Sequence, residues 1–219
     1  MKNRLLTLTF LLTSFFTYAQ RYTETFFKDF ELTKKTTEKN AKYKEIYSED
    51  EDSVVFIQAI NLKKNCLISE KYFKNKTPIG IWTYYNKNCT IINKKDFSKL
   101  VYSDKIIDTI FYNNNLKYDE HYQVAEFPGG KLALDEFLHT KMKFPIELVD
   151  ERFIGGVSLQ YMIKADGTIK MVSIRTSMHP LFDLEAWELF ERMPKWIPAK
   201  KDGKPIDSMG TYILIYDFD

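Results

Sequence analysis

The sequence predicts an α+β protein in which a small antiparallel β domain precedes a compact C-terminal module. Residues 125–219 read in order as a helix, two strands joined by a turn, a second helix and a last strand. Before them, residues 41–112 hold short β-branched and aromatic runs separated by turn residues, a pattern typical of paired strands. The 219 residues are 44% hydrophobic and 16% aromatic, which is enough apolar material for a core.

The first twenty residues read as an export signal. Lys2 and Arg4 precede an apolar run over residues 5–18, and Ala19 is followed by Gln20. A charged start, a hydrophobic stretch and a small residue at the junction are the parts of a signal peptide. We expect cleavage after Ala19 and a mature chain that is soluble without detergent. The alternative is an uncleaved membrane anchor, but a spanning helix needs about 20 apolar residues and this run is shorter.

The charge balance argues against a nucleic-acid partner. The whole sequence has 32 basic and 30 acidic residues. Residues 1–19 hold two basic residues and no acidic ones, so the expected mature chain carries 30 of each. Neither residues 20–123 nor residues 124–219 are basic enough to suggest nucleic-acid binding.

Residues 20–115 form the predicted β domain, and residues 116–124 form the linker that follows it. Strands are expected over residues 42–47, 54–60, 66–73, 79–85, 100–103 and 105–112. The run at 54–60 is apolar throughout and predicts a buried strand. The clearest hairpin joins residues 66–73 to residues 79–85 through a loop at 74–78. The pattern of residues 21–40 leaves a short helix and an edge strand both open.

Both cysteines lie in this domain, and the hairpin geometry pairs them. If the hairpin is symmetric about Thr77 and Pro78, Cys66 and Cys89 face each other. Directly opposed residues have Cβ atoms about 4.5–5.5 Å apart, within reach of a disulfide after a small adjustment. Such a bond persists in an exported protein. The alternative is two buried free thiols, which a one-residue slip of the hairpin would leave.

The C-terminal module opens with a chain break and an amphipathic helix. The break at residues 127–130 precedes four apolar side chains at helical spacing, Leu132, Leu134, Phe137 and Leu138. Asp135 and Glu136 are expected on the opposite side. Phe144 ends the helical region because a residue before proline avoids the α conformation. Residues 146–152 permit another short helix.

Two strands, a second helix and a final strand follow. One strand places alternate residues on a single face, namely Val157, Leu159, Tyr161 and Ile163. Asp166-Gly167 signals a hairpin turn, and the returning strand alternates Ile169, Met171 and Ser173 with Lys170, Val172 and Ile174. The helix after His179-Pro180 has an apolar side and an expected solvent side of Asp183, Glu185, Glu188 and Glu191. The last strand covers residues 210–216.

Several short motifs occur along residues 125–219 in a fixed order. They are Glu126-Phe127-Pro128-Gly129-Gly130, Phe144-Pro145, Gly156-Val157 with Asp166-Gly167, Met193-Pro194-Lys195-Trp196 with Pro198, and Gly203-Lys204-Pro205. This arrangement resembles the C-terminal domain of the energy transducer TonB. The resemblance implies a three-stranded antiparallel sheet with two helices on one face. It also implies a periplasmic module that grasps an extended segment of an outer-membrane transporter. In the β domain, residues 80–85 are similar to the second strand of a MORN-like repeat.

The resemblance also implies where a partner binds. In the resembled fold the last strand is a sheet edge, and an extended peptide adds beside it. The implied contacts on this strand are Thr211, Tyr212, Ile213, Leu214, Ile215 and Tyr216, and the flanking ones are Lys141, Met142, Lys143 and Phe144. Residues 213–216 lack the Lys and Pro that usually blunt an edge. The alternative is an edge buried against the β domain or against a second copy of the chain, as a homodimer.

Three functions compete. The first is a binding module in outer-membrane transport, and the second is an envelope scaffold that uses the same fold for another envelope protein. The third is an enzyme. A full transducer resembling TonB has a retained membrane helix with a polar signature and a long Pro-rich spacer. Residues 5–18 contain no His, and no such spacer is visible, so coupling to the proton gradient stays open.

No catalytic or cofactor-binding constellation emerges from the sequence. His121, His139 and His179 lie far apart, without metal-ligand spacing. A nucleophilic Cys66 or Cys89 would need a paired His. The glycine pairs at 129–130 and 155–156 lack the pattern of a phosphate loop. We therefore expect no enzymatic activity, no metal and no cofactor, and infer no small-molecule substrate.

Overall fold

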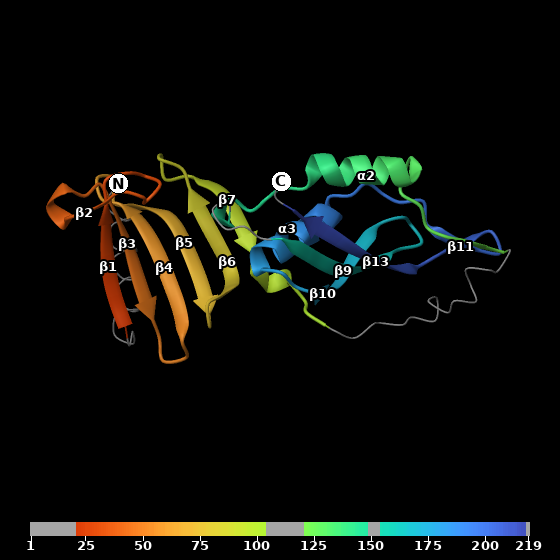
Figure 1. Ribbon diagram of the computed structural model, residues 1–219, viewed down its shortest axis with the longest axis horizontal. Helices are drawn as coiled ribbons and strands as arrows, with labels where there is room; N and C mark the ends of the chain where they lie inside the picture. Colours follow the sequence, from red (N-terminus) through yellow and green to blue (C-terminus); the bar gives the residue numbers. More distant parts are fainter. Residues whose placement is uncertain (1–20, 104–120, 149–153, 218–219) are drawn as a thin grey trace, which may run out of the picture. The chain divides into compact units, whose positions relative to one another are not determined.

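The computed structural model describes residues 21–103, 121–148 and 154–217 of the chain (Figure 1). The expected signal peptide and the strand expected over residues 105–112 lie outside these residues. The chain divides into two compact units, Met1–Ser98 and Lys99–Asp219. The division lies ahead of the linker expected at 116–124, since residues 99–103 belong to the second unit. The described end of that linker forms the short strand β8, Tyr122–Gln123.

The first unit is a seven-stranded antiparallel sheet with the strand order β2-β1-β3-β4-β5-β6-β7, which confirms the predicted small β domain (Figure 1). Its strands are β1 Arg21–Phe27, β2 Lys35–Thr36, β3 Tyr43–Glu49, β4 Val54–Asn61, β5 Cys66–Lys74, β6 Thr77–Tyr85 and β7 Ile91–Asp96. Two 3₁₀ turns accompany them, η1 Glu38–Asn40 and η2 Phe97–Lys99. Of the two options for residues 21–40, the strand is the one observed.

Burial in this sheet is distributed between its two faces. Trp82 is almost fully buried and packs its ring against Phe73 and Phe97, with ring centroids 4.8 and 4.9 Å apart. The run predicted as a buried strand is only half-buried in β4, where Ala59 and Ile60 are the apolar residues inside. The burial does not alternate along β4, since residues 54–58 are all half-buried and Ala59, Ile60 and Asn61 are buried in succession at the end of the strand.

The second unit combines helices with a three-stranded antiparallel sheet of order β10-β9-β13, as the sequence predicts. The strands of this sheet are β9 Gly155–Ile163, β10 Ile169–Thr176 and β13 Ser208–Tyr216. The helices are α2 Gly130–Lys141, α3 Pro180–Glu191 and the 3₁₀ turn η5 Ile146–Leu148. A second small sheet, absent from the prediction, joins β8 to the hairpin of β11 Ala199–Lys201 and β12 Lys204–Ile206.

Both helices face the same side of the three-stranded sheet. The predicted inward row of β9, residues 157, 159, 161 and 163, is buried. From this face the Tyr161 ring lies 5.0 Å from Phe190 of α3 and 6.1 Å from Trp196. Trp196 in turn packs on Phe127, which packs on Phe137 of α2. Aromatic contacts therefore connect the sheet to each helix.

Two details of the C-terminal pattern differ from the prediction. Leu132 of α2 is 84% exposed and does not belong to the buried stripe, because the helix contacts its neighbours mainly through Phe137 and Leu138. In β10, bulges interrupt the alternation after Met171 and after Ile174. The first bulge moves Ser173 to the face away from the helices, where its hydroxyl donates to Gln160 Oε1 across 3.1 Å.

The turn between β9 and β10 depends on a glycine. Gly167 has φ +83°, and its N–H donates to the Lys164 carbonyl across 2.8 Å. The Gly167 carbonyl accepts from the Trp196 N–H, also at 2.8 Å. A Cβ at position 167 would overlap the Trp196 carbonyl oxygen. The predicted Asp166-Gly167 turn thus also holds the Pro-rich loop at residues 193–198 against the sheet.

Candidate protein-binding edge

The two edges of the C-terminal sheet are treated differently. β13 pairs with β9 along its whole length, from Ser208 opposite Ile163 to Tyr216 opposite Gly155, and no other described strand pairs with it. At the β10 edge, the Ile174 N–H donates to the Val101 carbonyl across 2.7 Å, and the Ser103 N–H donates to the Ile174 carbonyl across 3.0 Å. Within the described part of the chain, β13 is therefore the unpaired edge.

The side chains of β13 alternate between two environments. Tyr212, Leu214 and Tyr216 point to the helix side, where Leu214 and Tyr216 are buried and Tyr212 lies 5.8 Å from the Phe190 ring. Thr211, Ile213 and Ile215 point to the opposite face and are exposed. Ile213 is 59% and Ile215 60% exposed, so this face presents two β-branched apolar side chains beside the open edge.

The main-chain groups of β13 can be assigned to one side or the other. The Lys164 N–H donates to the Thr168 carbonyl across 2.8 Å, so the main chain of Lys164 points toward β10. Neighbouring residues of a strand point opposite ways, so Ile163 points toward β13 and its partner Ser208 points back. The β9–β13 register is unbroken. Alternation along β13 therefore leaves the N–H and C=O groups of residues 211, 213 and 215 pointing outward.

An independent contact supports this assignment. Ile174 lies opposite Leu159 in the ladder, yet the N–H and C=O of Ile174 bond to residues 101–103. The Ile174–Leu159 pair therefore exchanges no main-chain hydrogen bonds. Leu159 must then point toward β13, in agreement with the alternation counted from Lys164. The outward donors on the open edge include the N–H groups of Ile213 and Ile215.

The four flanking residues lie where α2 ends. Lys141 is the last residue of the helix, and the Met142 N–H donates to the Leu138 carbonyl across 2.9 Å. The side chains of Lys141 and Lys143 are exposed. The Phe144 ring packs edge-on against Phe182 at 4.8 Å. Phe182 in turn lies 4.6 Å from Tyr216, which connects this segment to the end of β13.

A carboxylate that the sequence analysis did not single out as a site residue positions this segment. Glu185 of α3 accepts from the Lys143 N–H at 3.2 Å and from Arg192 Nη2 at 3.1 Å. Burial raises the pKa of Glu185, and the guanidinium of Arg192 opposes that shift. Burial, followed by the charges of Glu185 and Asp183, also raises the pKa of Tyr216. The segment at residues 141–144 is therefore held to α3 through Glu185, and the end of β13 contacts α3 through the rings of Phe182 and Tyr216.

Asp183 is the clearest departure from the predicted solvent side of α3. It is fully buried, and its Oδ2 accepts from the Ser177 hydroxyl at 2.6 Å and the Tyr102 hydroxyl at 2.9 Å. Burial raises its pKa to about 6, although the hydrogen bonds from Ser177 and Tyr102 lower it. Because Asp183 lies among glutamates, the sequence predicted that it faces solvent. The Ser177 and Tyr102 hydroxyls that bond to it come from outside α3, so the helical pattern could not reveal this contact.

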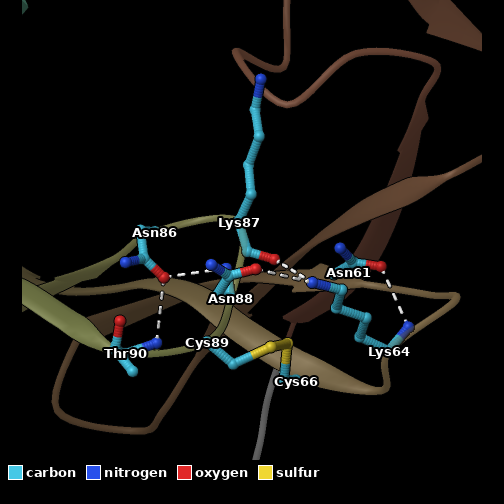
Figure 2. The surroundings of a disulfide bond; sticks show 8 residues. All are labelled: Asn61, Lys64, Cys66, Asn86, Lys87, Asn88, Cys89 and Thr90. Carbon is cyan, nitrogen blue, oxygen red and sulfur yellow. Dashed lines mark hydrogen bonds between the residues drawn. A yellow bond between two sulfur atoms is a disulfide. The ribbon is translucent and has the colours of Figure 1, made fainter.

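The predicted disulfide is present. Cys66 and Cys89 are bonded, with Cα atoms 6.0 Å apart. Figure 2 shows that hydrogen bonds join the same two turns beside the bond. Lys64 Nζ donates to the Lys87 carbonyl at 2.5 Å and to Asn88 Oδ1 at 3.2 Å. The turn after β6 is therefore tied to the start of β5 both covalently and by an ammonium group.

The hairpin register that led to this pairing was wrong. The loop between β5 and β6 is two residues long, Asn75 and Lys76, both with positive φ, as in a type I′ turn. Lys74 therefore lies opposite Thr77, and a bulge follows further along the ladder. Cys89 reaches Cys66 because it lies in the turn after β6, at φ +66°, rather than on the strand.

The described residues contain no cluster of three or more His, Cys, Asp or Glu side chains that could hold a metal ion. Over the same residues, no helix is long and apolar enough to cross a membrane. His139 is exposed near the end of α2, and His179 caps α3 by accepting the Leu181 N–H at Nδ1. Both His139 and His179 thus belong to helix ends and not to β13.

Comparison with protein families gives a match in the C-terminal unit. Residues 140–217 match the family described as Gram-negative bacterial TonB protein C-terminal. The match begins near the end of α2, covers α3 and the three-stranded sheet, and leaves the seven-stranded sheet outside. Neither the comparison with curated proteins nor that with solved structures gives a match. The matched family consists of protein-interaction domains rather than enzymes.

Proposed function

We propose, from the match of residues 140–217 to the TonB C-terminal family, that the chain is an exported envelope protein that takes part in outer-membrane transport. Its partner is an extended segment of an outer-membrane transporter, or of another envelope protein, exposed to the periplasm. The segment adds to the C-terminal sheet as a strand beside β13. Main-chain hydrogen bonds supply affinity in this mode, and alternate side chains supply selectivity.

The observation that carries the proposal is the open edge of β13. Its outward N–H and C=O groups belong to Thr211, Ile213 and Ile215, by the alternation established from Lys164. An exposed edge without Lys, Pro or a bulge is a template for another strand. β13 has none of these three features over residues 211–216. A partner strand of about five residues would meet all three outward residues, which span positions 211–215.

The surroundings of the edge add selectivity to this proposal. On the helix-free face, a partner side chain opposite Ile213 or Ile215 would meet an exposed β-branched group. At the end of the edge, Lys143 and Phe144 are fixed through Glu185 and Phe182. These groups favour a partner with apolar residues at alternate positions.

The disulfide supports the proposed location. Cys66 and Cys89 are bonded in the first unit, and disulfides persist in oxidising compartments such as the periplasm. The export signal expected at residues 1–19 directs the chain to the same place. Intact-mass measurement of the protein from its native host tests the second point, since it reads whether the chain begins at Gln20.

The test of the binding proposal uses the full mature chain and synthetic peptides that cover the periplasm-facing segments of the host's outer-membrane transporters. Calorimetry should find at least one peptide that binds. Ile213→Pro with Ile215→Pro removes two outward N–H groups, which an edge strand tolerates. Two lost hydrogen bonds weaken binding by about 2 kcal/mol, or roughly 30-fold.

Matched controls separate the edge from general damage. Ile213→Val with Ile215→Val keeps both N–H groups and should bind like the parent. Leu214→Pro removes an N–H that points toward β9, so it should lower stability instead. If the double proline variant is folded by circular dichroism and binds a peptide as the parent does, β13 is not the binding edge.

A second candidate is an envelope scaffold that uses the same domain without energy coupling. The observation in its favour is the seven-stranded sheet, which lies outside the family match and offers a second surface. Pull-down from envelope extract with the full chain and with a Lys99–Asp219 fragment distinguishes the two. A scaffold retains partners that only the full chain captures, whereas a transport module captures a transporter with either bait.

A further inference from the structure

The segment at residues 99–103 occupies the sheet edge opposite β13. Tyr102 forms a parallel bridge with Ile174 of β10. The two main-chain hydrogen bonds of this bridge use both the N–H and the C=O of Ile174, at 2.7 and 3.0 Å. These are the groups that an added strand would otherwise bond. The segment thus has the geometry of a short strand already added to β10.

Apolar burial is not what holds this segment. Val101 and Tyr102 are both 51% exposed. Instead, polar groups anchor the segment to α3. The Tyr102 hydroxyl donates to the buried Asp183, and Lys99 Nζ lies 3.3 Å from Glu188 Oε1 and 2.8 Å from Glu191 Oε2. The carboxylates of Glu188 and Glu191 raise the pKa of Lys99 against the effect of burial.

One anchor precedes the short pairing and the other lies at its centre. Lys99 precedes the bridge by three residues and is fixed to the last turns of α3, while Tyr102 is fixed to the first turn through Asp183. Asp183 gains a second donor from Ser177 and cannot turn to water, since it is fully buried. A pairing of only two main-chain bonds is marginal alone, because each contributes about 1 kcal/mol. The side-chain anchors make it persistent.

We infer that residues 99–103 are an edge cap that prevents β10 from accepting a strand, so that the domain takes one partner strand, at β13. Natural sheets avoid edge-to-edge association by covering or charging their edges. Here the β10 edge is occupied at Ile174, and within the described residues the β13 edge is left open. The assignment of β13 as the acceptor rests on the proposed function, whereas the covering of β10 stands on the contacts described above.

The test releases the cap in the full chain. Lys99→Ala, Tyr102→Phe and Ser103→Pro together remove the ion pairs, the hydroxyl and the donor N–H. Ser103→Pro alone is the milder variant in case the triple variant does not fold. Val101→Ala is the control, because it trims an exposed side chain and keeps the carbonyl that accepts from Ile174.

Two readouts decide the inference. Amide exchange at Ile174 should become at least tenfold faster in the released variant, and the control should match the parent. The released variant should then either take two peptides per chain in calorimetry or self-associate at micromolar concentration in sedimentation. Unchanged Ile174 exchange overturns the inference, as does a released variant that is monomeric and binds one peptide.

The outcomes also separate this inference from the proposed function. If the parent binds no peptide, the proposed function fails and self-association of the released variant still tests the cap. If the parent binds through β13 but release of the cap changes neither stoichiometry nor association, the proposed function stands and the cap has no role in it.

Discussion

The Tyr102 hydroxyl donates a hydrogen bond to Oδ2 of Asp183 across 2.9 Å, between residues 81 positions apart in the chain. Asp183 is fully buried, whereas Tyr102 is half exposed. A buried carboxylate in an α3 otherwise lined with glutamates is thus the point where the edge segment is attached. The contact has consequences for stability that can be measured.

The first prediction concerns pH. Burial raises the pKa of Asp183 from 3.8 to about 6. The folded chain therefore holds this proton more tightly than the unfolded chain, and the contribution of Asp183 to stability falls as pH rises from about 4 to about 6. Between these values the free energy of unfolding of the parent should fall by up to about 3 kcal/mol relative to Asp183→Asn.

Urea unfolding of both proteins at four pH values checks this prediction. Comparing the parent with Asp183→Asn cancels the contribution of Glu185, whose pKa is also raised. The asparagine keeps an oxygen that can accept from Tyr102 and Ser177, so the variant should fold. A difference in unfolding free energy that stays constant with pH would show that Asp183 does not titrate in this range.

The second prediction compares two glycines at left-handed φ. Gly167 at +83° lies against the Trp196 carbonyl, whereas Gly203 at +76° has nothing near the position of a Cβ. Gly203→Ala should cost only the left-handed backbone term, about 1 kcal/mol. Gly167→Ala adds the overlap with Trp196 and should cost about 3 kcal/mol. Thermal unfolding measures both costs. Equal costs would mean that the loop at Trp196 moves to accommodate the added methyl group without loss of stability.

The third prediction concerns the disulfide. Cys66 and Cys89 are 23 positions apart, and closing a loop of that length contributes about 3 kcal/mol, largely through the unfolded chain. Cys66→Ser with Cys89→Ser should destabilise the first unit by this amount and leave the unfolding of the second unit unchanged. Lys64→Ala, which removes only the bonds to Lys87 and Asn88, should cost less than half as much. Chemical unfolding monitored at Trp82, in the first unit, and at Trp196, in the second, distinguishes the two units.

The fourth prediction concerns the domain boundary. The compact module predicted from the sequence, tested as a fragment of residues 124–219, lacks the segment at residues 99–103. Because residues 99–103 bond to Ile174 and Asp183, a fragment of residues 99–219 should be more stable by about 2 kcal/mol, the sum of a few net hydrogen bonds. Urea titration of the two fragments measures this. Equal stability would mean that the edge segment and β8, which the shorter fragment also lacks, together contribute no net free energy.

The sequence predicted well those elements whose apolar residues keep one period. β9 carries four inward residues at alternate positions, and α3 carries Leu181, Leu184 and Leu189 on its buried side. Both were located from the pattern alone. β13 was predicted as a strand, and its place at a sheet edge came from the family resemblance rather than from its residues.

Other elements left no local signal. β7 reads Ile-Ile-Asn-Lys-Lys-Asp and is largely exposed, so neither period applies to it. Ser173 changes face through a bulge that only pairing with Gln160 reveals. Asp183 is buried by Tyr102, from a segment distant in the chain. The type I′ turn at Asn75 was readable, since Asn tolerates positive φ, and it would have corrected the register of the hairpin.

Strand addition requires that a partner strand bonds to the outward groups of β13, and amide exchange reads those groups one by one. In the free mature chain, the amides of Ile213 and Ile215 should exchange quickly, while those of Tyr212 and Leu214 are protected by β9. Saturation with a binding transporter peptide should slow Ile213 and Ile215 at least tenfold and leave Tyr212 and Leu214 nearly unchanged. Binding without added protection at residues 213 and 215 would contradict strand addition at this edge.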